Sequence, residues 1–377
     1  MKISNNALNI ATLSKIKGIG NAWIAQNFQA DSSEAEIIER VKRQIKKQIE
    51  ILQQKKDLSD KEKEEKIESL SCDYENTTTL FKNCKKQVES KLDSLENYAD
   101  GVIAFCDSGF PTYSAKIKDS DKPILLTYKG DLGLLTKDSL RIAVIGLLNP
   151  CDKIKHLEQK IIDKMLQKDA VIVSGLAKGC DEIAHRFTLQ KNGATIAILP
   201  STLQHILPST NAELAQEIAI NGGLLISEYI TECDNPRFGL LQRYIERDRL
   251  QALFSDAVCL VASFSENDSK KDKSKDSGSR HALNKAKEWG IMRITPKGIE
   301  KEWGIMRITP KGIENDERFN LNKEILSDKK SPAIEINAEN VGSVVEKIVK
   351  SKQSKQEKQK QTKKEQPKQN SLWNLDN

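Results

Sequence analysis

The residues with the clearest potential for chemistry form a short glycine-rich stretch, Val173-Ser174-Gly175-Leu176-Ala177-Lys178-Gly179-Cys180-Asp181. An apolar run precedes it and an amphipathic stretch follows, so it should connect a strand to a helix. Two glycines permit tight turns whose amides point at an anion, the helix adds its positive N-terminus, and Lys178 adds a full charge. The pattern favours a phosphate-binding loop made by Ser174, Gly175, Ala177, Lys178 and Gly179 over a plain turn, which needs only one glycine.

This loop matches neither a GxGxxG fingerprint nor a Walker A motif, so it does not indicate a dinucleotide site or a P-loop. Asp181 is expected to cap the helix that follows. His185 lies one turn further on, and we expect a packed, hydrogen-bonded histidine there rather than a general base.

Three arginines follow in LLQRYIERDRLQALFSDAV: Arg243, Arg247 and Arg249. Arg243 and Arg247 are four residues apart and share a helix face, whereas Arg249 lies on another side. Guanidinium groups suit bidentate phosphate contact. Salt bridges to neighbouring carboxylates would account for all three equally well, and the residues alone do not choose between these roles.

A third anion-binding arrangement is Ser277-Gly278-Ser279-Arg280, where two hydroxyls, a glycine and a guanidinium stand at a helix start. An ordinary serine-capped helix start explains the same pattern equally well. The preceding SENDSKKDKSKD reads as an exposed, charged loop.

The elements that would position these residues are short apolar runs alternating with amphipathic stretches. This alternation predicts an α/β fold with a Rossmann-like, doubly wound, mostly parallel sheet, whose ligands bind at the carboxyl ends of the strands. The expected strands are 142–146, 170–175, 195–200, 223–229, 257–263 and 291–295, and the expected helices are 154–168, 181–192, 210–221, 241–255 and 279–289.

The remaining chain divides into three parts. Residues 1–97 read as a helical region, 98–349 as the α/β domain with an irregular lead-in over 98–140, and 350–377 as a disordered, lysine-rich tail. In the first part Ile38, Val41, Ile45, Ile49 and Leu52 form one apolar helix stripe, and Ser59 with Glu62 forms a capping box. A solvated helical hairpin is the simplest interpretation there, with a coiled-coil dimerisation arm as the alternative.

The 377 residues carry 60 Lys+Arg and 54 Asp+Glu, a formal net charge of +6. The tail accounts for +5 of it, so the folded part is nearly neutral and bulk charge does not argue for nucleic-acid binding. Seven scattered cysteines without a CxxC pair, together with only four histidines, predict no disulfide scaffold and no metal site. Because no signal-peptide or membrane-spanning pattern is found, we expect a cytoplasmic protein.

KEWGIMRITPKGIE occurs twice without change, at 287–300 and 301–314. Solenoid repeats diverge and occur at least three times, so an identical pair indicates either a recent tandem duplication or an artefact of sequence assembly. One copy is expected to form an extra loop or edge segment.

Over about residues 98–295 the chain resembles the DNA-processing protein A (DprA/Smf) family. Four segments carry this resemblance, in the following order: SGLAKGCDEIAH, GATIAILPSTLQHILPSTNAELAQEIAINGGLLISEY, RDRLQALFSDAV and SGSRHALNKAKEWG. Ser174, Gly175, Gly179 and Asp181 match its SGxAxGxD loop, Arg247 and Arg249 its RNR, and Ser277, Gly278 and Ser279 its SGS. The chain departs from the family after the first strand, where Gly146-Leu147-Leu148-Asn149 replaces a Gly-Ser-Arg, which removes a phosphate-contacting arginine. Leu13-x-x-Ile16-Lys17-Gly18-Ile19-Gly20 resembles a helix-hairpin-helix turn, although a simple helical corner is favoured.

The resemblance implies a non-enzymatic protein, commonly a homodimer, that binds single-stranded DNA and passes it to a RecA-type recombinase during natural transformation, without a cofactor. Tyr244 and Phe238 are the candidate base-stacking side chains. The alternatives are a nucleotide hydrolase of the LOG type, for which Glu228 would be the only good acid, and a nucleotide sensor in a defence system.

Overall fold

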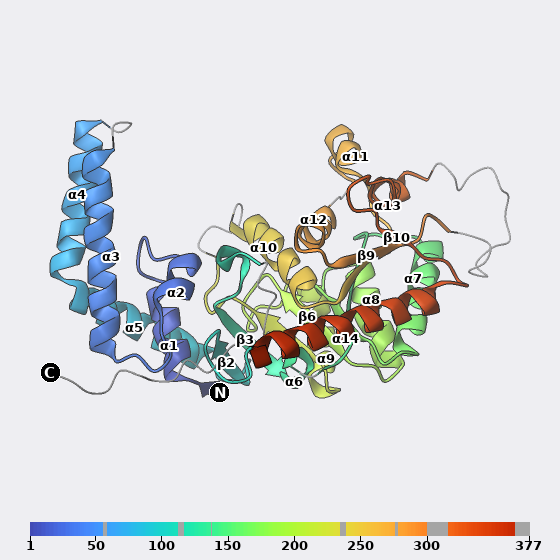
Figure 1. Cartoon of the computed structure of the whole chain (residues 1–377), viewed down its shortest axis with the longest axis horizontal. Coiled ribbons are helices and arrows are strands. Elements are labelled where there is room, and N and C mark those ends of the chain that lie inside the picture. The colour runs from blue at the N-terminus through green and yellow to red at the C-terminus, as the bar shows by residue number, and fades with distance from the viewer. Residues whose placement is uncertain are drawn as a thin grey trace.

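The protein is described by a computed structural model of residues 1–55, 59–111, 117–136, 138–233, 239–275, 278–299 and 316–365. A single sheet runs through it in the order β1-β2-β3-β7-β6-β5-β4-β8-β9-β10. Helices cover both faces of this sheet, and a pair of long helices, α3 and α4, extends away from it (Figure 1).

The centre of the sheet is parallel and confirms the predicted doubly wound fold. From β7 to β9 each strand pairs in parallel with its neighbour. Strand order reverses at β4, which lies between β5 and β8. The six strands are β4 (Arg141–Ile145), β5 (Val171–Ser174), β6 (Thr195–Leu199), β7 (Leu224–Ser227), β8 (Ala257–Leu260) and β9 (Met292–Thr295).

Alternate residues of these strands pack on opposite faces, as the two-residue period of a strand requires. In β4, Ala143 and Ile145 pack with helices α10 and α12, whereas Ile142 and Val144 pack with α7, α8 and α14. The crossover helices are α7 (Asp152–Leu166), α8 (Cys180–Gln190), α9 (Ala212–Ile220), α10 (Gly239–Leu253) and α12 (Arg280–Trp289). Every predicted strand and helix of this unit is therefore present.

The lead-in over 98–140 is not irregular, which corrects the prediction. It supplies β2 (Gly101–Ala104), β3 (Leu125–Gly130) and the short helix α6 (Gly133–Thr136). β3 pairs antiparallel with both β2 and β7, so it extends the parallel sheet. All four residues of β2 are buried, and so short a run shows no alternation by which a strand could be recognised.

Residues 1–97 are helical as predicted, apart from β1 (Lys2–Ile3), which pairs with β2. The helices are α1 (Asn5–Leu13), α2 (Asn21–Asn27), α3 (Glu34–Gln54), α4 (Asp60–Glu75) and α5 (Thr77–Ser94). The capping box of Ser59 and Glu62 is present at the start of α4. Gly18 has φ +82° and its carbonyl accepts a hydrogen bond from Gln48 Nε2 at 2.9 Å, so this turn packs against α3.

The C-terminal segment differs from the disordered tail predicted from residue 350. After α13 (Asn320–Leu326) and β10 (Ile334–Glu335), helix α14 spans Val341–Glu365. Val341, Val344, Val345 and Ile348 are buried and anchor its first turns. Lys352 then pairs with Asp256 at 3.1 Å, and the lysine- and glutamine-rich sequence that follows propagates the helix. Residues 366–377 lie outside the described part.

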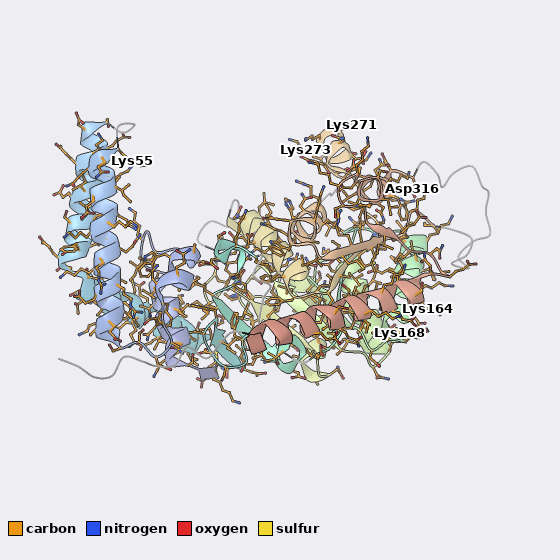
Figure 2. The ribbon with its side chains drawn as sticks, viewed as in Figure 1. Lys55, Lys164, Lys168, Lys271, Lys273 and Asp316 are labelled. Atoms are coloured by element: carbon orange, nitrogen blue, oxygen red, sulfur yellow. The ribbon has the colours of Figure 1, made fainter. Side chains whose placement is uncertain are left out.

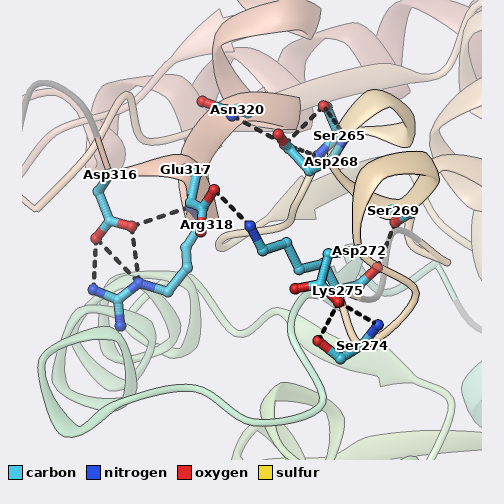
Figure 3. Close-up of polar contacts among 10 residues, drawn as sticks. All are labelled: Ser265, Asp268, Ser269, Asp272, Ser274, Lys275, Asp316, Glu317, Arg318 and Asn320. Carbon is cyan, nitrogen blue, oxygen red and sulfur yellow. Dashed lines mark hydrogen bonds and ion pairs between the residues drawn. The ribbon is translucent and has the colours of Figure 1, made fainter.

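The charged segment before Ser277 is also more ordered than predicted, because Ser265 and Asp268 form a capping box that starts α11 (Glu266–Lys271). Figure 3 shows Asn320 donating to Asp268 at 2.9 Å and Lys275 pairing with Glu317 at 2.8 Å. The labelled Lys271 and Lys273 lie at the outer end of this segment (Figure 2). The second copy of the duplicated sequence, 301–314, lies outside the described residues, and the first supplies β9.

Among the described helices, none combines the length and the apolar character needed to cross a bilayer.

Candidate functional site

A pocket of about 550 Å³ opens at the carboxyl ends of the central strands, at the reversal of strand order. Its walls come from the loop after β4, the loop after β5, one face of α10 and the start of α12. Ligands of doubly wound sheets bind at this position. The lining includes Gly146, Leu148, Asn149, Ala177, Lys178, Asp181, Pro208, Leu241, Tyr244, Ile245, Arg247, Asp248, Gln251, Gly278, Ser279 and His281.

The glycine-rich loop is held from inside by Asp181. Its Oδ2 accepts hydrogen bonds from the Gly175 amide at 3.1 Å and from the Ala177 amide at 3.3 Å. These two amides therefore point at an internal carboxylate, which takes the place that the predicted phosphate was to occupy. The prediction that Asp181 caps the next helix is wrong, since Gly179 is the N-cap of α8 and no side chain caps it.

Two glycines of this loop are required by close approaches. A Cβ at Gly175 would lie 1.1 Å from Arg247 Nη1. Gly179 has φ +79°, and a Cβ there would lie 2.3 Å from the carbonyl oxygens of Leu147 and Leu148. Ser174 is buried, and its Oγ donates to the Val144 carbonyl at 2.7 Å, so it ties β5 to β4.

Arg247 lies beneath the loop, and two carboxylates compensate its positive charge. Nη1 lies 3.4 Å from Asp181 Oδ2, and Nε lies 3.4 Å from Asp248 Oδ1. The guanidinium also lies over the Tyr244 ring, 5.5 Å from its centroid. Only 4% of the residue is exposed, so Arg247 shapes the floor of the pocket.

The other two arginines of the cluster are engaged away from the pocket. Arg249 makes a bidentate pair with Glu228 at 2.6 and 2.7 Å, and its Nε donates to the Asp121 carbonyl at 3.0 Å. Arg243 donates to the Thr231 carbonyl at 2.9 Å and to the Glu232 carbonyl at 3.1 Å. The salt-bridge alternative therefore describes Arg247, which pairs with Asp181 and Asp248, and Arg249, whose counter-ion is Glu228.

Of the remaining predicted residues, Lys178, Gly278 and Ser279 line the pocket. Lys178 is exposed, and no ion pair of it occurs within the described ranges. Ser279 donates to the Gly146 carbonyl at 3.3 Å and does not cap α12 with its side chain. Arg280 begins α12 and Gly278 lies in the pocket wall. Ser277 and Phe238 lie outside the described residues.

His185 is buried as expected, and its Nδ1 lies 2.7 Å from Thr195 Oγ1. That hydroxyl donates to the Ile172 carbonyl, so Nδ1 carries a proton and donates it to Thr195 Oγ1. Burial, together with the positive charge of Arg247, lowers the pKa of His185 to about 3. A ring that stays neutral and fully buried supports the loop and performs no proton transfer on a ligand.

Sequence reasoning missed a buried pair under the same loop. Glu158 of α7 and Cys180 at the start of α8 are completely buried, and burial raises the pKa of both groups. The Cys180 thiol therefore stays protonated and is no nucleophile. It also missed the α10 residues Leu241, Tyr244, Ile245, Asp248 and Gln251 as one pocket-lining set; their spacing of three and four residues is the signal that could have found them.

The sheet and its pocket define a Rossmann-like α/β protein with a pocket at the switch point of the sheet. Residues 101–288, which include all of the pocket walls, match the family model of DNA recombination-mediator protein A. The chain is 32% identical over 141 residues to DNA processing protein DprA of Bacillus subtilis and 40% identical over 127 residues to that of Streptococcus pneumoniae. The chain belongs to the DprA/Smf family.

These matches cover 37% and 34% of this chain, and 46% and 43% of the two relatives. The chain thus spans less than half the length of the curated relatives that it matches. The solved structure of DprA from Streptococcus pneumoniae aligns with a TM-score of 0.51 at 25% identity, over 70% of this chain and 80% of that one.

Proposed function

We propose that this chain binds single-stranded DNA at the strand-end pocket and delivers it to a RecA-type recombinase during natural transformation, as a cytoplasmic homodimer without catalytic activity. The observation that carries the proposal is that the pocket lies wholly within residues 101–288, which match the DNA recombination-mediator protein. The residues that line the pocket thus all belong to the part of the chain that matches the family.

Phosphate contact on this proposal falls mainly to the mouth of the pocket. Lys178 is the exposed cation there, and Ser279 and Arg280 stand at the N-terminus of α12, which carries a partial positive charge. Gly175 and Ala177 act indirectly, because their amides are bound to Asp181. Contacts to phosphates carry no base information, so binding through this mouth tolerates any sequence.

The lysines of α14 after Val349 add a second, nonspecific electrostatic contribution. Lys352 is not one of them, because it pairs with Asp256 and its Nζ contacts the Ser139 carbonyl. A chain ending at Ser354 keeps those contacts and removes the tail lysines from Lys355 onward.

The test is a gel-shift of labelled single-stranded DNA over a salt series, with wild type, Lys178→Ala and the chain ending at Ser354. Lys347→Ala is the matched control, because Lys347 is exposed on α14 and lies outside the pocket. Each lost phosphate contact should lower the slope of log K against log salt by about 0.7. Wild-type binding that ignores salt, or that equals duplex binding, contradicts the proposal.

A further inference from the structure

A pair of long helices, which we call the arm, projects from the rest of the protein (Figure 1). It consists of α3 (Glu34–Gln54) and α4 (Asp60–Glu75), and the labelled Lys55 lies at its tip (Figure 2). A capping box starts each helix, so the local sequence favours both helices independently of their surroundings. The arm lies outside residues 101–288, so the family match does not account for it.

The arm buries little of its own surface. No residue of α3 beyond Ile45 is buried, and α4 has no buried residue at all. The apolar side chains of the outer half are only half-buried or exposed: Ile49, Ile51, Leu52, Ile67 and Leu70. Helices in water depend on packing of an apolar face for most of their stability, and two helices alone leave this face incompletely covered. A second pair of helices would close the arm into a four-helix bundle.

The charges near the base of the arm are separated between its two helices. Residues 40–47 of α3 carry five cations and no carboxylate. Residues 68–75 of α4 carry three carboxylates and no cation. The base of the arm therefore has a positive helix beside a negative one, and a second arm could oppose each helix with the other kind.

Four exposed side chains are suited to such a contact. Arg43 and Lys46 are three residues apart on α3, and Glu68 and Glu75 are two turns apart on α4, so each pair shares a helix face. None of the four makes an ion pair within the described part of the chain. Their charges are therefore available to a partner.

The contact between Lys42 and Tyr74 shows which residues of the two helices lie at the same height. Lys42 Nζ lies 5.0 Å from the centroid of the Tyr74 ring. The helices run in opposite directions from this contact, with a rise of about 1.5 Å per residue. Each of the two exposed cations therefore lies within about 3 Å of the height of one exposed carboxylate.

We propose that the arm binds the arm of a second copy of this chain, with α3 of each copy packed against α4 of the other. A two-fold axis parallel to the arm preserves every height, so Arg43 faces the partner's Glu75 and Lys46 faces the partner's Glu68. Each contact then occurs twice. An axis across the arm would place α3 against α3 and bring the cations of residues 40–47 together, which like-charge repulsion disfavours.

The inference deepens the proposed function, because it names a surface for the proposed homodimer, and it rests on the proposed function for that stoichiometry alone. The arm contributes no residue to the strand-end pocket. Self-association and DNA binding can therefore be measured separately.

The experiment reverses one side of the contact at a time. Self-association is measured by sedimentation velocity over a concentration series at low salt, without DNA. One variant carries Arg43→Glu with Lys46→Glu, and the other carries Glu68→Lys with Glu75→Lys. Each variant opposes like charges at both symmetric contacts, so its dimer dissociation constant should rise about 30-fold, because four exposed ion pairs are lost.

An equimolar mixture of the two variants tests the geometry of the contact. In the mixed dimer, the reversed α3 of one chain faces the reversed α4 of the other, and two unchanged helices face each other at the second contact. Both contacts are then complementary, so the mixture should dimerise about as tightly as wild type. A chain that carries all four changes should do the same by itself.

The matched control is Lys347→Glu with Lys350→Glu, which reverses two exposed cations that are also three residues apart, on α14. This variant should self-associate as wild type does. A 30-fold weakening in the control would show that net charge, and not the arm, governs association, and would overturn the inference.

Three other outcomes would contradict the inference. A wild-type dimer that neither arm variant weakens overturns it and leaves the proposed homodimer to another surface. Weakening that neither the mixture nor the chain with all four changes reverses also overturns it. A wild type that stays monomeric overturns both the inference and the homodimer, whereas the gel-shift with single-stranded DNA still decides the proposed DNA binding.

Discussion

Replacing Arg249 tests whether its guanidinium binds phosphate or belongs to a structural ion pair, and the structure predicts the ion pair. Arg249→Met would leave Glu228 with its bidentate partner removed, and only about a tenth of either side chain is exposed. The hydrogen bonds from Arg249 to the Asp121 and Glu246 carbonyls would be lost as well. Breaking a buried pair from one side costs about 3–5 kcal/mol.

The assay is urea unfolding followed by far-ultraviolet circular dichroism, with DNA affinity measured on the folded variant over a salt series. At an m-value of about 3 kcal/mol per M, the midpoint should fall by about 1 to 2 M. The salt slope of DNA binding should be unchanged. The double variant Arg249→Met with Glu228→Gln removes the orphaned charge and should regain part of the loss.

A normal unfolding midpoint in Arg249→Met, together with a salt slope reduced by about 0.7, would refute this reasoning. That result would show that the Arg249 guanidinium binds phosphate and does not pair with Glu228.

Three further predictions concern the same site. Lys178→Ala should lower the salt slope by about 0.7 and leave the unfolding midpoint unchanged, and a change in the midpoint alone would contradict its assignment to the mouth of the pocket. Gly175→Ala should cost about 1–3 kcal/mol, because its Cβ would meet Arg247 Nη1, whereas Gly342→Ala, in open space on α14, should be neutral or slightly stabilising. The pKa of His185 is lowered to about 3 in the folded protein, so its contribution to stability is present above pH 6.5 and is lost as the pH falls toward 3. The loss should reach about 3 kcal/mol between pH 7 and pH 4, and His185→Gln should flatten that part of the unfolding profile; an unchanged profile would show that another group is responsible.

The central fold could be predicted because its signals are local. Short aliphatic strands buried on both faces, such as Ile142–Ile145, alternate with amphipathic helices, and this pattern admits few topologies. The lead-in strands escaped prediction because β2 is four buried residues long, and its pairing with β3 depends on contacts remote from its own sequence. Helix α14 escaped for a related reason, since valines before residue 350 anchor the lysine-rich stretch after it.

The sequence by itself predicted where the candidate site lies: the glycine-rich loop with Lys178, the arginine cluster and the start of α12 all follow predicted strands. Only the tertiary structure decided what each charge does. Asp181 lies six residues from Gly175 along the chain, yet its carboxylate holds the loop amides and meets Arg247, whose partners come from two separate elements. A side chain's availability for a ligand depends on such distant partners, because a buried charge is compensated by whatever the fold brings beside it. For this reason the three arginines that suggested a phosphate site in the sequence have internal partners instead: Arg247 shapes the floor of the pocket, Arg243 and Arg249 are engaged away from it, and Lys178 at the mouth carries the proposed contact.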